Sequence, residues 1–212
     1  MLNNAQMNWQ KTLRLGLIGG LVGILIALVG MVESFDKRDI IAGVITMGQT
    51  LLLLAVLVTA YFAATNSARA TSPLSILSGV IAGLIFSLML GLLALAIENF
   101  DLRPVLVNAS PQLVRILTFE EGLPGGLVNL FLMGVVIGAV GGVIHMLPAR
   151  IRSAVTLGLA VVAFIGLMQE ILQVTLRSVP ALDDGLTWMF GRGTEKGVSA
   201  AGAIVIFIVT VV

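Results

Sequence analysis

The residues best placed to do chemistry lie near the end of a long apolar stretch, where one carboxylate has amide and guanidinium neighbours. Glu170, Gln173 and Arg177 are three and four residues apart, so a helix places them on one face, and Gln169 adjoins them. An ionised carboxylate about 9 Å inside a membrane-spanning helix costs on the order of 1–3 kcal/mol unless it is paired or hydrated. This cluster is therefore a candidate contact for a proton or a polar substrate. The alternative is a polar girdle at the membrane surface.

A second group of polar side chains occurs near one end of another apolar stretch. Thr46, Gln49 and Thr50 lie within one turn of a helix there. A buried amide needs hydrogen-bond partners in lipid, so Gln49 and Thr50 must face other helices or a water-filled cavity. Asn129 is expected to hold two helices together. His145 is the only histidine and cannot form a metal site without further ligands, so it is expected to pack at the membrane surface.

The sequence contains none of the usual catalytic or cofactor-binding signatures. It has no cysteine, hence no thiolate nucleophile and no disulfide, and it lacks the HExxH, GxSxG and GxGxxG patterns. We therefore expect no enzyme activity and no cofactor. The net charge of +1 gives no basic field to hold a nucleic acid.

Composition places the chain in a membrane. Of its 212 residues, 58% are hydrophobic and 11% are charged, with a mean hydropathy of +1.09. An average soluble domain has about 25% charged residues. A soluble domain with as few charged residues as this chain could not cover its surface with them. The alternating pattern of barrel strands is absent, so helices must satisfy the backbone in lipid.

The apolar runs predict an all-α, polytopic bundle of about six transmembrane helices. A cytoplasmic segment, 1–14, precedes a transmembrane helical domain, 15–212. A span needs roughly 20 apolar residues, and the last run is cut short at the C-terminus, as expected of the leading part of a longer protein or of a tail docked on a partner. The expected spans are 15–32, 40–64, 74–97, 126–147, 154–176 and 198–212.

The connections between these spans differ on the two sides of the membrane. On side A (1–14, 65–73 and 148–153) they are short, with five basic residues and no acid. On side B (33–39, 98–125 and 177–197) they are longer and carry seven basic and ten acidic residues. Density of basic charge in short loops favours side A, and with it the N-terminus, in the cytoplasm.

One connection on side B predicts a short helix of its own. Ser110 suits the N-cap and Pro111 the first helical position, and Leu113, Ile116 and Leu117 then fall on one face. An amphipathic helix over about 111–120 is expected at the membrane surface, with a re-entrant piece or a lid over the bundle as alternatives.

Glycines recur at four-residue spacing within the expected spans. Gly79 and Gly83 form one such pair and Gly134 and Gly138 another. Small residues at this spacing let helix backbones approach closely in lipid, which predicts a compact bundle.

Four stretches of the sequence resemble a known family. They are similar to the leading region of certain bacterial permeases. These permeases belong to ABC transporters of the branched-chain amino acid type, in variants with extra N-terminal helices. These stretches are IIAGVITMGQTLLLLAVLVTAYFAA (40–64), LVNASPQLVRILTFEEGL (106–123), MLPARIR (146–152) and DGLTWMFGRGTEKGVSAAGAIVIF (184–207).

The resemblance implies a location in the bacterial inner membrane and import of small amphipathic solutes such as branched-chain amino acids. It also implies ATPase subunits on the cytoplasmic side, a second permease, and an extracytoplasmic binding protein facing the acidic loops of side B. In that scheme these helices are scaffold. The alternative is a non-catalytic accessory or scaffold subunit of a larger respiratory, photosynthetic or translocating membrane complex.

Overall fold

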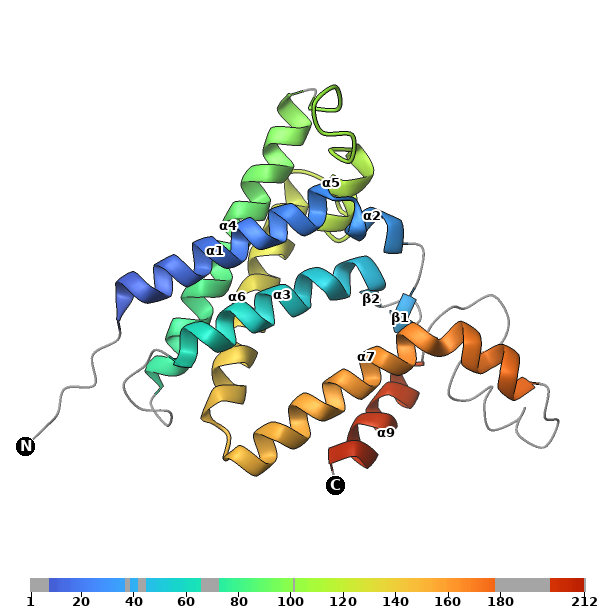
Figure 1. Cartoon of the computed structure of the whole chain (residues 1–212). Coiled ribbons are helices and arrows are strands. Elements are labelled where there is room, and N and C mark those ends of the chain that lie inside the picture. The colour runs from blue at the N-terminus through green and yellow to red at the C-terminus, as the bar shows by residue number, and fades with distance from the viewer. Residues whose placement is uncertain are drawn as a thin grey trace, which may run out of the picture. The chain divides into compact units, whose positions relative to one another are not determined.

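In the computed structural model, the described residues fold almost entirely as helices (Figure 1). The structure describes residues 8–36, 39–41, 45–65, 73–100, 102–177 and 199–211. For 166–177 it describes the helix backbone and not the side chains. The prediction of an all-α bundle is confirmed. The elements are α1 (Trp9–Leu28), α2 (Met31–Phe35), β1 (Asp39–Ile41), β2 (Ile45–Thr46), α3 (Met47–Thr65), α4 (Leu74–Asn99), α5 (Pro111–Leu117), α6 (Gly125–Met146), α7 (Ala149–Arg177) and α9 (Ala200–Val211).

Four described helices are long and apolar enough to cross a membrane. They are α1, α3, α4 and α6, with 20, 19, 26 and 22 residues, against the roughly 20 that a bilayer requires. Their outer faces carry exposed leucines, valines and phenylalanines, which in a bilayer contact lipid. The protein is thus a multi-pass membrane protein. The remaining predicted spans, 154–176 and 198–212, fall on α7 and α9.

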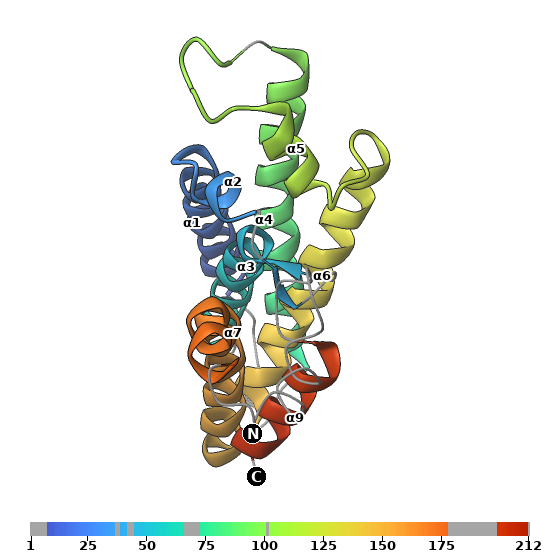
Figure 2. The same cartoon turned by 90° about the vertical axis from the view of Figure 1, so that its right-hand side faces the viewer.

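The helices gather into two compact units. The larger unit comprises Met1–Ser34 and Leu51–Leu147, and the smaller unit comprises Phe35–Thr50 and Pro148–Val212. In the larger unit α4 packs against both α1 and α6, and Figure 2 shows α4 and α6 side by side. Phe86 and Leu90 on α4 are among its most deeply buried side chains.

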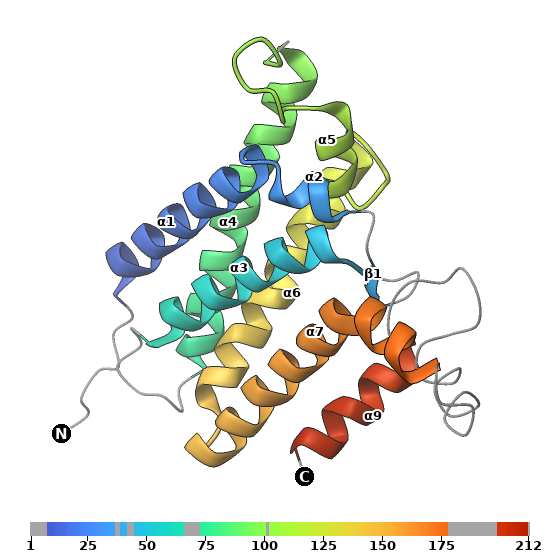
Figure 3. The ribbon, with the colours of Figure 1, turned by 45° about the vertical axis from the view of Figure 1, so that its right-hand side comes forward.

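The smaller unit pairs α7 with α9, which lie side by side in Figures 1 and 3. A Cβ added at Gly158 on α7 would lie 2.9 Å from the ring of Phe207 on α9, so the glycine admits that ring. Ala203 is the buried centre of this contact, and Val162, Ile165 and Ile206 surround it.

The second predicted span, 40–64, begins later in the structure than the hydropathy indicates. Residues 39–41 and 45–46 form two short antiparallel strands, with Asp39 opposite Thr46, and α3 begins at Met47. Apolar, β-branched residues such as Ile40, Ile41 and Ile45 satisfy a hydropathy criterion equally well in a strand or a helix. The boundary between strand and helix is set by a helix start signal at Thr46, three residues before Gln49, which is described below.

The predicted amphipathic helix forms, and it covers the core of the larger unit. The Ser110 hydroxyl accepts a hydrogen bond from Leu113 N at 3.0 Å, and Pro111 opens the helix, as expected. Leu113, Ile116 and Leu117 are all buried in the core cluster of this unit. This packing agrees with a lid over the bundle, while a position at the membrane surface stays a prediction.

The helix α5 ends at Leu117, three residues before the predicted end. Phe119 and Glu120 adopt left-handed backbone angles, with φ of +53° and +68°. Glu120 N donates to Arg115 O at 2.8 Å. This tight turn at the C-terminus of the helix therefore supplies a partner for a carbonyl that would accept a helical hydrogen bond if the helix continued.

Candidate functional site

The predicted cluster around the membrane carboxylate lies on α7. The helix runs unbroken through Gln169, Glu170, Gln173 and Arg177, so their backbone positions share one helix. Their side chains lie outside the described residues. The role of this cluster stays a prediction.

The predicted Gln49 cluster is a helix start. The backbone N–H of Thr46 donates to Gln49 Oε1 at 3.1 Å, and the backbone N–H of Gln49 donates to Thr46 Oγ1 at 3.1 Å. This reciprocal pair is a capping box, which satisfies two N–H groups that have no partner within the helix. Thr50 donates its hydroxyl to Thr46 O at 2.9 Å. The structure thus brings the predicted residues together, and the hydrogen bonds between them begin α3.

An acidic side chain completes this helix start. The Thr46 hydroxyl donates to Asp36 Oδ1 at 3.1 Å, which links α3 to the residue that follows α2. Gln49 is buried, with 8% of its surface exposed. Since its carbonyl oxygen accepts the Thr46 N–H, the buried amide is partly satisfied within the protein.

Two other polar predictions fall on α6. Asn129 is half-buried and precedes Leu130, which belongs to the core cluster. His145 packs edge-on against Tyr61 of α3, with ring centroids 5.7 Å apart, so its packing role is supported. Within the described ranges, no three histidine, aspartate or glutamate residues gather in a way that could hold a metal ion.

A chain of buried hydroxyls, which the sequence reasoning missed, connects three helices of the larger unit. Thr12 of α1 and Ser78 of α4 share a hydrogen bond of 2.8 Å. The Ser78 hydroxyl donates to Ala63 O of α3, also at 2.8 Å. Because that hydroxyl is the donor to Ala63, Ser78 accepts from Thr12. Both side chains are fully buried, so each hydroxyl has a partner where water cannot supply one.

A pair of small-residue ridges brings α4 and α6 into backbone contact. A Cβ added at Gly138 would lie 2.6 Å from Gly79 O, and one added at Gly83 would collide with Gly134 O. Real Cβ atoms do not come that close, so backbone meets backbone. The ridge positions repeat every four residues; the small ones are Ser75, Gly79, Gly83, Ser87 and Gly91 on α4, and Gly126, Gly134, Gly138 and Gly142 on α6, where Leu130 takes the position between the first two.

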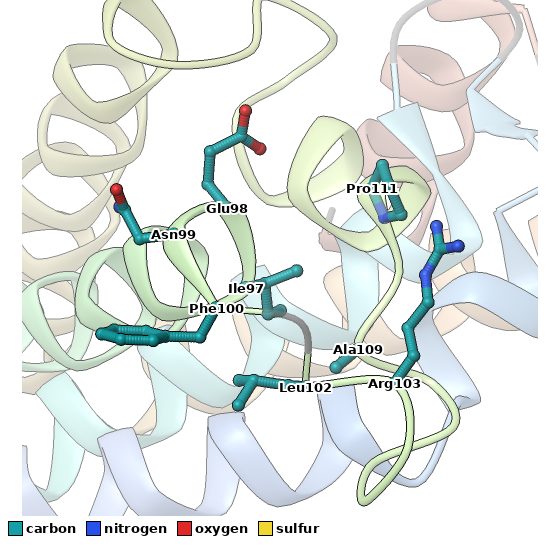
Figure 4. Close-up of a pocket in the computed structure, with 8 residues that line it drawn as sticks. All are labelled: Ile97, Glu98, Asn99, Phe100, Leu102, Arg103, Ala109 and Pro111. Atoms are coloured by element: carbon teal, nitrogen blue, oxygen red, sulfur yellow. The ribbon is translucent and has the colours of Figure 1, made fainter.

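A pocket of about 250 Å³ lies at the end of α4 (Figure 4). Its floor includes the buried Ile97 and Ala109, and its rim carries the exposed, oppositely charged Glu98 and Arg103. Solvent screens charges on such an open rim, so their hold on a ligand is weak. The lining residues are Ile97, Glu98, Asn99, Phe100, Leu102, Arg103, Ala109 and Pro111.

Comparison with known proteins adds no assignment to this geometry. No family model, no curated protein and no solved structure matches the chain.

Proposed function

We propose that this chain is the scaffold portion of an ABC-type importer permease for small amphipathic solutes such as branched-chain amino acids. In this role its helices hold a membrane-embedded frame, and a second permease, cytoplasmic ATPase subunits and an extracytoplasmic binding protein complete the transporter. The proposal combines the sequence resemblance with the way the described helices pack.

The observation that carries the scaffold role is the backbone contact between the ridges of α4 and α6. A solute needs space along its path, whereas these two helices meet backbone to backbone at Gly79, Gly83, Gly134 and Gly138. Small-residue contacts of this kind are how helices associate in lipid, where no hydrophobic effect draws them together. The geometry favours a rigid frame over a passage between α4 and α6.

The buried polar groups support the same role. Thr12 bonds to Ser78, Ser78 donates to the backbone of α3, and Thr59 donates its hydroxyl to Ala55 O at 2.7 Å. Gln49 and Thr46 bond to each other at the start of α3. Each of these groups makes a hydrogen bond that holds a helix or joins two helices.

A second candidate function rests on the same close packing. A non-catalytic accessory subunit of a larger respiratory, photosynthetic or translocating complex needs a rigid bundle with apolar outer faces, and the larger unit supplies both. The two functions differ in the proteins that surround the chain.

Purification from native membranes in mild detergent after crosslinking tests the proposal. We expect the tagged chain to bring down ABC-type ATPase subunits and a second permease, and disruption of its gene to abolish uptake of a branched-chain amino acid. An unrelated membrane protein with the same tag is the control. Recovery of redox or pigment-binding subunits, with unchanged uptake after disruption, would establish the accessory function instead.

A further inference from the structure

The segment that joins α4 to α5 displays apolar side chains where a water-exposed loop would carry polar ones. Val105 and Val107 are 82% and 84% exposed, the highest values among the large apolar side chains that the structure describes. Phe100, directly after α4, is 65% exposed. Leu102 and Leu106 of the same segment instead pack against the core of the larger unit.

The backbone of this segment is suited to a surrounding of low polarity. Leu106 N donates to Leu102 O at 2.7 Å, Val105 N donates to the same carbonyl at 3.1 Å, and Ala109 N donates to Leu106 O at 2.9 Å. Non-helical backbone enters the membrane only where its polar groups have partners. These turns satisfy three N–H groups locally, which lowers the cost of leaving water.

A side-chain hydrogen bond places the segment at the end of a surface that faces lipid. Asn108 Nδ2 donates to Leu28 O at 2.8 Å, across the last turn of α1. Gly30 lets this turn approach the Asn108 side chain. Its φ of +85° suits glycine, and a Cβ there would lie 2.9 Å from the Asn108 amide. The outer face of α1 carries an exposed apolar stripe at four-residue spacing that ends beside this bond; it consists of Leu13, Leu17, Leu21, Leu25 and Val29.

We propose that residues 102–107 form a membrane-surface anchor that inserts Val105 and Val107 among the lipids at the C-terminal end of α1. The occupant of this apolar surface is lipid, because the Asn108–Leu28 bond holds the segment beside the end of the lipid-facing stripe of α1. Arg103 is exposed on the same segment, which suits contact with the phosphates of lipid headgroups. Interfacial elements of this kind reach roughly 5–10 Å into the boundary between headgroups and acyl chains.

Tryptophan fluorescence in lipid vesicles tests the anchor on the full chain. Trp9 and Trp188 are first replaced by phenylalanine, and Val107→Trp then supplies the single reporter, with Val105→Trp as a second variant. The matched control is Gln112→Trp, an exposed position on α5 only five residues further along the chain. The probes are phosphatidylcholine brominated near the start of its acyl chains, and iodide present on both sides of the bilayer.

We expect brominated lipid to lower the emission of Val107→Trp and Val105→Trp by about two-fold or more, as for side chains at the acyl boundary, and iodide to quench mainly Gln112→Trp. Iodide quenching of the valine positions equal to that of Gln112→Trp would overturn the proposal, since the segment would then lie in water. Protection of the valine positions from both probes would also overturn it, because a protein surface would then cover them. None of these outcomes depends on the transport role proposed above.

Discussion

At the scale of single residues, the absence of a side chain decides how this protein packs. Two glycines on α4 have different surroundings. A Cβ at Gly83 would collide with the backbone carbonyl of Gly134, whereas a Cβ at Gly91 would make ordinary contacts, the nearest at 3.4 Å. The two positions lie on one ridge of the same helix, so a comparison between them isolates the effect of close backbone approach.

Gly83→Ala is expected to destabilise the bundle by about 1–3 kcal/mol, the usual cost of overpacking a core. Gly91→Ala is expected to be neutral or slightly stabilising, because alanine favours a helix over glycine. Unfolding of the purified proteins in mixed micelles with increasing dodecyl sulfate measures both. Equal stability of the two variants would show that α4 and α6 are not in backbone contact.

At the scale of elements, local hydrogen bonds decide where helices begin and end. The capping box of Thr46 and Gln49 begins α3 inside a stretch of uniformly high hydropathy, and the Ser110 hydroxyl begins α5. Ser110 also donates to Glu33 Oε2 at 3.0 Å, which joins the start of α5 to α2. A capping residue such as Ser110 therefore both begins its helix and bonds that end of the helix to a neighbouring element.

Thr46→Val is expected to cost about 1 kcal/mol, since it keeps the shape of threonine and removes the hydroxyl that accepts from Gln49 N. Thr46→Ser keeps that hydroxyl and serves as the control. Hydrogen exchange of the peptide covering 45–52 measures the effect, with faster exchange expected in Thr46→Val alone. Similar exchange in both variants would mean that the capping box contributes little to the start of α3.

At the scale of the whole molecule, the positions of charged residues decide the orientation in the membrane. The short side A connections carry basic residues without acids, which favours their retention in the cytoplasm. Two exposed positions of the larger unit, Thr65 at the end of α3 and Gln112 on α5, report on the two sides. The chain has no cysteine, so a single introduced thiol is an unambiguous label site.

Spheroplasts expressing Gln112→Cys are expected to react with a membrane-impermeant maleimide, whereas Thr65→Cys is expected to react only after permeabilisation. Full denaturation before labelling controls for expression of each variant. The reverse pattern would place the N-terminus outside the cytoplasm and contradict the orientation inferred from loop charge.

The sequence by itself determined the fold class, the membrane environment and the helix start at Ser110, because hydropathy, charge depletion and capping residues act locally. Its glycine spacing also indicated close packing. Only the tertiary structure showed which ridges meet, that Thr12 and Ser78 share a hydrogen bond, and that the Gln49 cluster begins a helix. The physical reason is that a hydroxyl or amide in an apolar stretch must have a hydrogen-bond partner, which the sequence shows. Which group is that partner depends on how residues distant in the chain pack together.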